Sequence, residues 1–324
     1  MDKSSLIRTP IEQELVDFEE LFDSSLTNSN PLLNEVLLHL KKGKGKMMRP
    51  ILVLLIAKLF GKVSKSTLHA AVALELLHTA SLVHDDVVDE STKRRGQLSA
   101  NAIYNNKIAV LVGDYILATC LVQANLSSDS EIVSVVAHLG QDLSEGEVLQ
   151  LSNVSNAEIS EGVYFDVIRK KTAALFAACT EAAAISAKAS AEQVEKARLF
   201  GEYIGICFQI KDDIFDYYES EELGKPTGND MLEGKLTLPA IHVLTSKQNA
   251  EADNWAARVK TSEATQEEIS LLIEYIKQNG GIEYAKKVMY DYKQKALDLI
   301  ADVDDADIKA ALAEYLNYVV DRVK

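Results

Sequence analysis

The stretch His84-Asp85-Asp86-Val87-Val88-Asp89-Glu90 lies within an otherwise apolar segment, and the rest of the chain is organised around it. A second copy of its Asp-Asp-x-x-Asp pattern occurs in Lys211-Asp212-Asp213-Ile214-Phe215-Asp216. Each copy follows a long run of Leu, Ala, Val, Ile and Phe. Adjacent carboxylates repel each other, and their desolvation is strongly unfavourable unless a cation is near. Two such clusters therefore indicate metal ions or a cationic ligand.

Apolar residues recur at steps of three and four, as in Leu199, Tyr203, Ile206 and Ile210, which is the period of a helix. No proline occurs between Pro50 and Pro226, so a long stretch lacks the commonest helix breaker. Strand-like alternation is absent from the sequence. We therefore predict an all-α fold, with residues 1–324 forming a single-domain helical bundle around a central cavity.

Composition sets limits on function and location. The net charge of −15 argues against general nucleic-acid binding, because no basic surplus exists to neutralise phosphates. The three cysteines are far apart and show no Cys-x-x-Cys spacing, so we interpret them as core residues in a reducing compartment. We expect neither a signal peptide nor a transmembrane segment, and we predict a cytoplasmic protein.

Helical spacing gives the acidic clusters a specific chemistry. Positions i and i+4 share a helix face, so Asp85 and Asp89 can bind one hard cation, with Asp86 behind them. The second cluster repeats this arrangement with Asp212, Asp216 and Asp213. Oxygen-only ligands favour Mg²⁺, which often bridges carboxylates to the phosphates of a substrate. The alternative interpretation of either cluster alone is an exposed acidic helix end.

Basic segments supply the other half of an anion site. Gly45-Lys46-Met47-Met48-Arg49-Pro50 places a flexible loop and two cations before a helix start. Further cations follow each cluster or flank the second half of the chain: Arg94, Arg95, Lys171 (followed by Thr172), Lys225 and Lys235. Residue types and spacing alone predict a magnesium-dependent enzyme that handles a diphosphate on an apolar substrate. They do not identify the reaction.

A resemblance to a known family narrows this prediction. The motifs resemble, in family order, those of the trans-polyprenyl diphosphate synthases, which have the isoprenoid synthase fold. The matching stretches are Gly45-Lys46 with Arg49-Pro50, residues 75–89 with Arg94-Arg95-Gly96, Lys171-Thr172, residues 208–216, Gly224-Lys225-Pro226 and residues 235–239. The resemblance covers essentially the whole chain, and the paired clusters make it specific.

The resemblance implies a prenyltransferase that elongates an allylic prenyl diphosphate with isopentenyl diphosphate. It implies about three Mg²⁺ ions held between the clusters, and a homodimer. The residues that match the isopentenyl diphosphate site are Lys46, Arg49, His78 and Arg95. Those that match the allylic site are Asp85, Asp89, Arg94, Lys171, Gln209, Asp212, Asp216, Lys225 and Lys235. Thr172 belongs to the same motif as Lys171.

The implied chemistry needs no side chain as general base. Metal ions and cations stabilise the departing diphosphate as its C–O bond breaks, and the double bond of isopentenyl diphosphate attacks the allylic cation. The released diphosphate then accepts a proton. His84 is left with a structural or indirect role. The residues to which the resemblance gives catalytic roles are Asp85, Asp89, Arg94, Lys171, Gln209, Asp212 and Lys225.

Residues just upstream of the first cluster bear on product length. Ala80 and Ser81 lie about one helical turn before Asp85, and in this family aromatic residues there close the cavity after a short product. Small residues predict a long product, of about thirty to forty carbons, as a precursor of a quinone side chain. Leu77 lies further down, and Tyr115 is a candidate for the floor. Alternatively, Ala80 and Ser81 only permit close helix packing.

Other functions stay open at this point. A short-chain synthase, making a geranylgeranyl or farnesyl product, shares all of these motifs. A class I terpene cyclase also ionises a diphosphate with Mg²⁺, but such enzymes lack the isopentenyl diphosphate cations Lys46, Arg49 and Arg95. A non-catalytic synthase subunit, usually missing one cluster, and a plain acidic helical bundle are the remaining alternatives.

Overall fold

The computed structural model of the protein describes residues 3–43, 45, 47–94, 96–154, 159–218 and 227–322. The fold is all-α, as predicted, with one two-stranded hairpin among these residues. The described residues fall into two compact units. The first comprises Met1–Gln141, Leu175–Gly201 and Leu299–Tyr315, and the second Asp142–Ala174, Glu202–Asp298 and Leu316–Lys324. The prediction of a single domain stays a prediction.

The first unit contains the first acidic cluster. Its elements are α1 (Lys3–Arg8), the 3-10 helix η1 (Thr9–Ile11), α2 (Glu12–Ser25), α3 (Pro31–Lys42), α4 (Met48–Phe60), α5 (Lys65–Val88), β1 (Lys93–Arg94), β2 (Gln97–Leu98), α6 (Ala100–Tyr104) and α7 (Asn106–Leu126). Parts of α8 (Ser130–Val154), α10 (Ala174–Ser186), α11 (Ala191–Phe215) and α17 (Ala306–Asp321) complete it.

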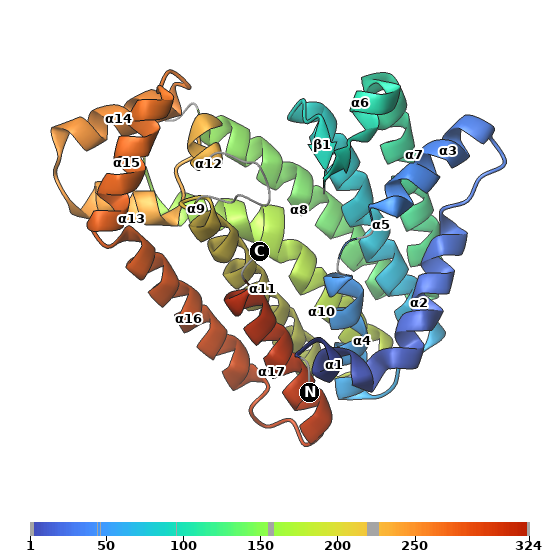
Figure 1. Cartoon of the computed structure of the whole chain (residues 1–324). Coiled ribbons are helices and arrows are strands. Elements are labelled where there is room, and N and C mark those ends of the chain that lie inside the picture. The colour runs from blue at the N-terminus through green and yellow to red at the C-terminus, as the bar shows by residue number, and fades with distance from the viewer. Residues whose placement is uncertain are drawn as a thin grey trace. The chain divides into compact units, whose positions relative to one another are not determined.

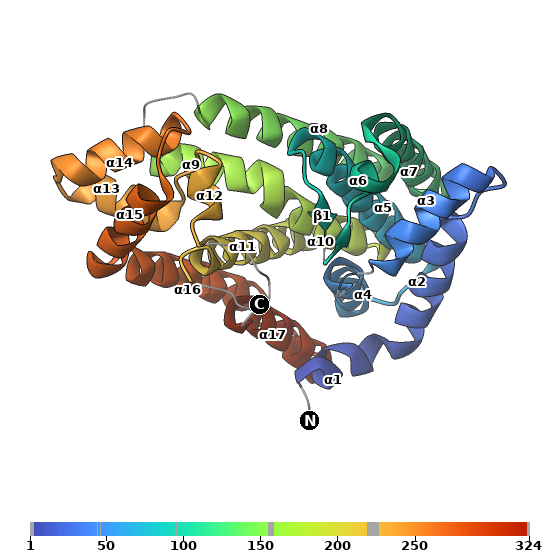
Figure 2. The ribbon, with the colours of Figure 1, turned by 45° about the horizontal axis from the view of Figure 1, so that its top comes forward.

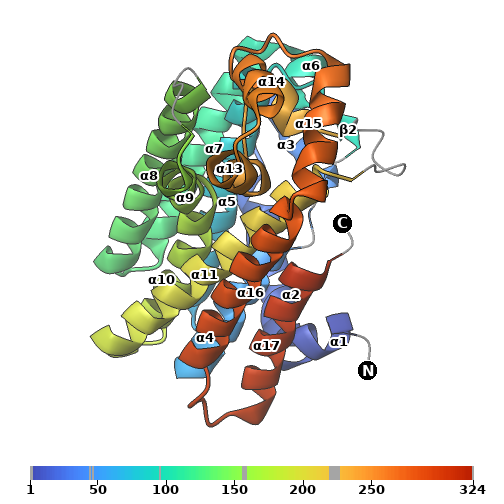
Figure 3. The same cartoon turned by 90° about the vertical axis from the view of Figure 1, so that its left-hand side faces the viewer.

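The second unit contains the second acidic cluster, at the carboxyl end of α11. Its own elements are α9 (Glu161–Ile168), the π-helix η2 (Arg169–Ala173), α12 (Asn229–Leu232), α13 (Leu238–Ser246), α14 (Ala250–Lys260), α15 (Gln266–Gln278) and α16 (Gly281–Leu299). Within it, α15 contacts both α13 and α14, and the three form one group (Figure 2). Helix α16 runs along α11, where the Cys207 thiol donates to the Met289 carbonyl oxygen (Figure 3).

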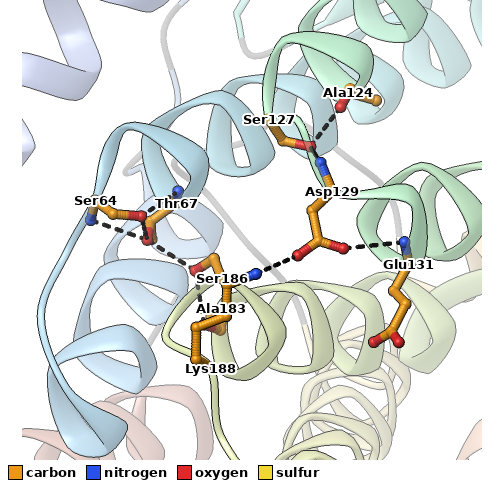
Figure 4. A network of polar contacts seen from close by, with 9 residues as sticks. All are labelled: Ser64, Thr67, Ala124, Ser127, Asp129, Glu131, Ala183, Ser186 and Lys188. Carbon is orange, nitrogen blue, oxygen red and sulfur yellow. Dashed lines mark hydrogen bonds and ion pairs between the residues drawn. The ribbon is translucent and has the colours of Figure 1, made fainter.

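Helix α5 is the core of the first unit because its apolar residues surround most of its circumference. It begins with a capping box, in which Ser64 and Thr67 exchange backbone and side-chain hydrogen bonds. The Thr67 hydroxyl also lies 2.7 Å from that of Ser186 at the end of α10, as Figure 4 shows. Helix α7 packs along α5 (Figure 1). Helix α5 is therefore held at its amino end by the cap and along its length by α7.

Close approach of α7 to α5 depends on one glycine. A Cβ atom on Gly113 would lie 2.2 Å from Nε2 of His84, far inside contact distance. The His84 ring fills that space, and its Nε2 lies 3.2 Å from the Val110 carbonyl oxygen and 3.4 Å from a carboxylate oxygen of Asp114. His84 therefore ties the first cluster to α7, which fits the structural role expected of it.

Sequence periodicity located the long helices well and missed local departures. The π-helix η2 lies between α9 and α10, and apolar spacing did not indicate it. The basic turn after the first cluster is the hairpin β1–β2, in which Lys93 pairs with Leu98. Two short helices, α6 and α12, were not predicted. Each has five residues or fewer, too few to show a period.

The cysteines and the apolar helices bear on two further expectations. Cys120, Cys179 and Cys207 are free and buried, as expected for core residues, and burial raises the pKa of each thiol to about 12. Helices α5 and α7 are long and apolar enough to cross a membrane by length and composition, with 67% and 39% of the relevant windows buried. A buried core helix passes the same test, so the expected absence of a membrane span stays a prediction.

Candidate active site

The first cluster places its middle carboxylate inside and its outer ones towards solvent. Asp86 is only 5% exposed, and one of its carboxylate oxygens accepts two hydrogen bonds from Arg94, at 2.9 Å from Nε and 2.6 Å from Nη2. Asp85 is half-buried one residue earlier. Asp89 is exposed and caps the carboxyl end of α5, where its backbone N–H donates to the Asp85 carbonyl oxygen. Asp85 and Asp89 thus stand one turn apart, while Arg94 compensates Asp86.

Arg94 reaches Asp86 because the chain reverses direction after α5. Strand β1 pairs with β2 through Arg94 and Gln97, and Gly96 adopts a φ of +76° in the turn, a conformation that glycine tolerates. The Asn101 amide group closes the base of this hairpin by donating to the carbonyl oxygens of Asp86 and Ser91. The hairpin therefore presents Arg94 to the cluster on a braced support.

Other predicted residues of the first unit surround a cavity of about 80 Å³. Asp86, Arg94, His78 and Gly45 line it, together with Glu75. Arg49 lies in the same unit, where its guanidinium stacks 5.3 Å from the centre of the Phe176 ring and its buried Nε has no hydrogen-bond partner among the described residues. An orphaned buried donor is unusual in a protein interior. Lys46 and Arg95 lie outside the described residues.

The second cluster also buries its middle carboxylate, but with neutral partners. Asp213 is 2% exposed, and its two carboxylate oxygens accept from the Tyr164 hydroxyl at 2.5 Å and from the Gln209 amide nitrogen at 2.8 Å. The amide oxygen of Gln209 in turn accepts from the Thr172 hydroxyl at 2.7 Å. A continuous hydrogen-bonded chain therefore runs from Thr172 through Gln209 to Asp213 and Tyr164.

Burial changes the proton affinity of the carboxylates around this chain. The pKa of Asp213 is raised well above its usual range, mainly by burial and also by the charge of Asp230. Hydrogen bonds from Tyr164 and Gln209 lower the pKa but do not offset the burial. Burial, with Asp216 nearby, raises the pKa of Asp230 to about 7. The unliganded second cluster thus has more carboxylates than cations to compensate them, the condition that favours binding of a metal ion.

The outer carboxylates of the second cluster have defined partners. Asp216 accepts hydrogen bonds from the backbone N–H groups of Asn229, at 2.9 Å, and Asp230, at 3.1 Å, at the start of α12. Asp212 pairs with the guanidinium of Arg322 near the carboxyl terminus, with 2.7 Å between Oδ1 and Nη2. Asp216 therefore anchors α12, and Asp212 holds the end of α17.

Lys171 and Thr172 lie in the π-helix η2, and a π-helix within an α-helix frequently marks a functional site. Helix α8 passes very close to this segment, since a Cβ atom on Gly146 would lie 2.8 Å from the Lys171 backbone nitrogen. The next residue of α8, Glu147, forms an ion pair with the Lys171 ammonium group. The π-helix thus redirects Lys171 and Thr172 while α8 braces them.

The predicted residues of the second unit meet around a cavity of about 250 Å³. Its lining is partly polar, with Lys171, Thr172, Gln209, Asp213 and Lys235, and partly apolar, with Ile159, Val163, Val167, Leu236 and Ile241. The Lys235 ammonium group lies 2.6 Å from a carboxylate oxygen of Glu233. Such a cavity fits an amphiphile with an anionic head and an apolar tail. Lys225 lies outside the described residues.

The residues expected to set product length lie on α5. Ala80 is 1% and Leu77 is 5% exposed, whereas Ser81 is half-buried and its hydroxyl donates to the His78 carbonyl oxygen. Tyr115 of α7, the candidate floor, is half-buried and accepts a hydrogen bond from the Asn28 amide group at 3.0 Å. This bond fixes the Tyr115 ring against the turn between α2 and α3.

The carboxylate arrangement suits a metal ion that takes some of its ligands from the protein and the others from a substrate. Among the described residues, no three His, Cys, Asp or Glu side chains converge into a preformed metal site. Mg²⁺ usually takes one or two carboxylates and completes its octahedron with water and substrate phosphates, so a closed protein cage is not required. Asp85 with Asp89, and Asp212 with Asp216, offer the hard oxygen donors that it prefers.

Sequence reasoning missed several residues that the structure brings to the second cluster. Tyr164 precedes Lys171 by two helical turns, so helical spacing could have found it. Asp230, Lys260 and Arg322 gave no such signal: the first two line the cavity from separate elements, and Arg322 follows α17. Contacts between residues so distant in sequence depend on tertiary packing.

Comparisons with known proteins agree with this geometry. The family model described as "Polyprenyl synthetase" matches residues 30–276. The octaprenyl diphosphate synthase of Haemophilus influenzae is 35% identical over 92% of this chain and 91% of its own length. A crystal structure titled geranylgeranyl pyrophosphate synthase from Bacteroides thetaiotaomicron is 59% identical, covers 99% of this chain and 100% of its own, and has a TM-score of 0.88. One of a decaprenyl diphosphate synthase from Rhodobacter capsulatus is 34% identical over 98% of both chains, with a TM-score of 0.91.

Proposed function

This chain belongs to the polyprenyl synthetase family and is a trans-prenyl diphosphate synthase, a prenyltransferase, and we propose that it condenses isopentenyl diphosphate with an allylic prenyl diphosphate in a magnesium-dependent reaction. The hydrogen-bonded chain from Thr172 to Asp213 carries the proposal. It connects a π-helix bearing Lys171 to the second acidic cluster, beside a cavity lined by both polar and apolar side chains. A prenyl diphosphate has the same mixed character.

Each class of residue has a role in binding or ionising the allylic diphosphate. Lys171 and Lys235 bind its phosphate oxygens, and Gln209, oriented by Thr172, donates to the leaving group or holds Asp213. Asp85 and Asp89, with Asp212 and Asp216, supply oxygen ligands to Mg²⁺. When bound, Mg²⁺ neutralises the charge that develops on the departing diphosphate. Lys225, outside the described residues, belongs to the same group by family resemblance.

Isopentenyl diphosphate binds through residues of the first unit. Arg49, whose buried Nε has no partner among the described residues, lies in that unit, and His78 lines a cavity there. An arginine fork matches the geometry of phosphate oxygens, so Arg49 is the anchor of this substrate among the described residues. Lys46 and Arg95 join it by family resemblance. The released diphosphate takes the proton, so the proposal requires no side chain as a general base.

A direct assay tests the reaction. Purified protein is incubated with isopentenyl diphosphate, farnesyl diphosphate and Mg²⁺, and the products are weighed by mass spectrometry. Products heavier than the starter by whole isoprene units, formed by the protein alone and lost with EDTA, support catalysis. A terpene cyclase would instead release a hydrocarbon or alcohol. A non-catalytic subunit would give no product, and either outcome overturns the proposal.

For product length we propose about thirty to forty carbons, because Ala80 and Ser81 are small and leave room beside α5. Ala80→Phe should then shorten the main product while condensation continues, and Ala80→Val is the milder control. An unchanged product overturns the tunnel assignment. A shorter, twenty-carbon product is the alternative, and the 59% identity to a structure titled geranylgeranyl pyrophosphate synthase favours it. The same product masses decide between the two.

We further propose a cytoplasmic homodimer. Helix α7 carries a stripe of exposed apolar side chains at helical spacing, with Leu111 63% and Val122 56% exposed, and Val110 and Leu121 beside them. An exposed apolar stripe of this kind is typical of a protein interface, and a second copy of the same stripe is the natural partner. Light scattering should give twice the chain mass, and Leu111→Glu should give the monomer.

A further inference from the structure

The carboxyl-terminal end of the chain contacts the second acidic cluster. Arg322 follows the last residue of α17, and its Nη2 donates to Asp212 Oδ1 at 2.7 Å and to the Phe208 carbonyl oxygen at 2.9 Å. The side chain of Arg322 is only 13% exposed, whereas that of Asp212 is 42% exposed. A largely buried cation is thus held by one of the carboxylates to which we give a metal-binding role.

The contact is built by a whole face of α11. The Arg322 guanidinium lies 3.9 Å from the centre of the Phe208 ring and 5.5 Å from that of Phe215. Phe208, Asp212 and Phe215 are spaced by four and three residues, so they share one helix face. Two aromatic rings therefore flank the carboxylate that receives the guanidinium. This arrangement is specific to a planar cation, because arginine both stacks and donates.

Other positively charged side chains lie near Arg322. Besides burial, the positive charges of Arg322 and Lys286 both act on Lys211 and lower its pKa, and the negative charge of Asp321 opposes them. Binding of a divalent cation at Asp212 would add two further charges beside the guanidinium. With little water around the Arg322 side chain to screen them, the two cations repel each other strongly.

We propose that Arg322 and the metal ion compete for Asp212, so that the carboxyl terminus acts as an internal counter-ion that leaves the cluster when metal binds. This inference rests on the metal-binding role given to Asp212 above. In the ligand-free protein Arg322 keeps the exposed carboxylate paired. Metal binding breaks the contact, and the end of α17 is released from the face of α11.

Limited trypsin digestion tests the competition directly, because trypsin cleaves after Arg322 only when its side chain is available. Cleavage removes Val323 and Lys324, and intact-protein mass spectrometry follows their loss. We expect slow cleavage in the ligand-free protein and cleavage at least about fivefold faster at saturating Mn²⁺. Asp212→Asn should be cleaved fast with or without Mn²⁺. A peptide of residues 316–324 controls for any effect of Mn²⁺ on trypsin itself.

Mn²⁺ titration followed by electron paramagnetic resonance gives an independent measure. Removal of a competing cation in Arg322→Gln should tighten the weakest Mn²⁺ site by about three- to tenfold. Arg322→Lys, which keeps the charge but loses the stacked guanidinium, should lie between the wild type and Arg322→Gln. Arg258→Gln is the matched control, because Arg258 pairs with Glu268 in the same unit and its loss removes the same charge. It should leave Mn²⁺ affinity unchanged.

The outcomes separate this inference from the proposed function. If the wild-type protein binds Mn²⁺ while Arg322 stays protected, or if Arg322→Gln binds no more tightly than Arg258→Gln, the competition is wrong and the metal-dependent reaction stands. If the wild-type protein neither binds Mn²⁺ nor needs it for turnover, the metal-binding role itself fails. Fast cleavage of Asp212→Asn without metal would still show that Asp212 holds the carboxyl terminus.

Discussion

The two acidic clusters share the pattern Asp-Asp-x-x-Asp and a place at the carboxyl end of a long helix, yet their buried carboxylates have different partners. Asp86 of the first cluster faces the guanidinium of Arg94, a charged partner. Asp213 of the second faces the Tyr164 hydroxyl and the Gln209 amide, which carry no charge. The same motif is thus compensated in one cluster and left electrostatically unfavourable in the other.

This difference shows that the cost of ionising the buried carboxylate of one motif depends on its partners. A carboxylate paired with arginine stays ionised at little cost, whereas one held by neutral donors in an apolar setting resists ionisation. The raised pKa values of Asp213 and Asp230 show that ionisation is unfavourable in the second cluster. We infer that the second cluster gains more from metal binding than the first.

The largest expected effect comes from removing a metal ligand in each cluster. Asp85→Ala and Asp212→Ala should each lower turnover by about 10²–10³-fold or more, because each removes a ligand that stabilises charge only as the diphosphate departs. Rates at saturating substrate measure the effect, and thermal melting verifies the fold. Asp166→Ala, an exposed carboxylate of the second unit, is the control. Near-normal turnover in either variant would mean that its cluster does not bind the catalytic metal.

The next effect concerns the glycines that allow neighbouring helices to approach the cluster-bearing ones. A Cβ atom on Gly201 of α11 would lie 2.4 Å from the Phe176 carbonyl oxygen, and one on Gly113 would lie 2.2 Å from the His84 ring. Backbone yields less than a side chain, so Gly201→Ala should cost about 3 kcal/mol and Gly113→Ala about 1–2 kcal/mol. Urea denaturation measures both.

Gly140→Ala controls for helix propensity, since nothing lies within 4 Å of its Cβ position on α8. It should raise stability by about 0.5–1 kcal/mol, the usual gain of alanine over glycine in a helix. If Gly113→Ala proved as damaging as Gly201→Ala, the His84 ring would be as rigid as backbone. The packing of α7 against the first cluster would then be as unyielding as the packing at Gly201.

Much of this architecture was predictable because it follows from the local spacing of apolar residues in the sequence. The ends of α5 and α11, and the place of Asp85 and Asp212 on them, follow from apolar spacing and from the acidic pattern itself. The grouping of Lys171, Thr172, Gln209 and Asp213 was also expected, through family resemblance. These features depend on residues close in sequence or on motifs whose order is fixed.

The pairings of Arg322 with Asp212 and of Tyr164 with Asp213 were not predictable, because these partners lie far apart in the sequence. Arg322 lies 110 residues from Asp212, and Tyr164 lies 49 residues from Asp213. No periodicity connects such pairs. The π-helix η2 was also missed, since one extra residue in a turn does not disturb apolar spacing enough to show. Charge compensation is a tertiary property, so the difference between the clusters was invisible in the sequence.

A smaller effect compares the two buried carboxylates directly in the ligand-free protein. Asp86→Asn leaves Arg94 without its anion, and the loss should be about 1–2 kcal/mol, limited because the Arg94 side chain is 38% exposed and water screens it. Asp213→Asn replaces an acid that already resists ionisation, so the loss should be below about 1 kcal/mol. Urea denaturation at pH 7 with EDTA measures both. A larger loss for Asp213→Asn would mean that Tyr164 and Gln209 require a full negative charge.

A pH dependence of stability should also distinguish the second cluster. Burial raises the pKa of Asp230 from its usual value of 3.8 to about 7, so the folded protein binds this proton more tightly than the unfolded chain does. The unfavourable ionisation is therefore absent below pH 4, grows as pH rises, and is complete above pH 7. Asp230→Asn removes it. The stability of the variant relative to wild type should rise by about 1–2 kcal/mol between pH 4 and pH 7.5.

Urea denaturation across this pH range, with EDTA present, measures that difference. Asp166→Asn removes an exposed carboxylate from the same unit and controls for the loss of one charge. The backbone N–H of Asp230 still reaches Asp216 in the variant, so the anchor of α12 is kept. A flat difference would mean that Lys235, the cation that lowers the pKa of Asp230, already compensates it. The carboxylates of the second cluster would then be compensated by a cation like those of the first. Metal binding would not relieve any unfavourable charge there.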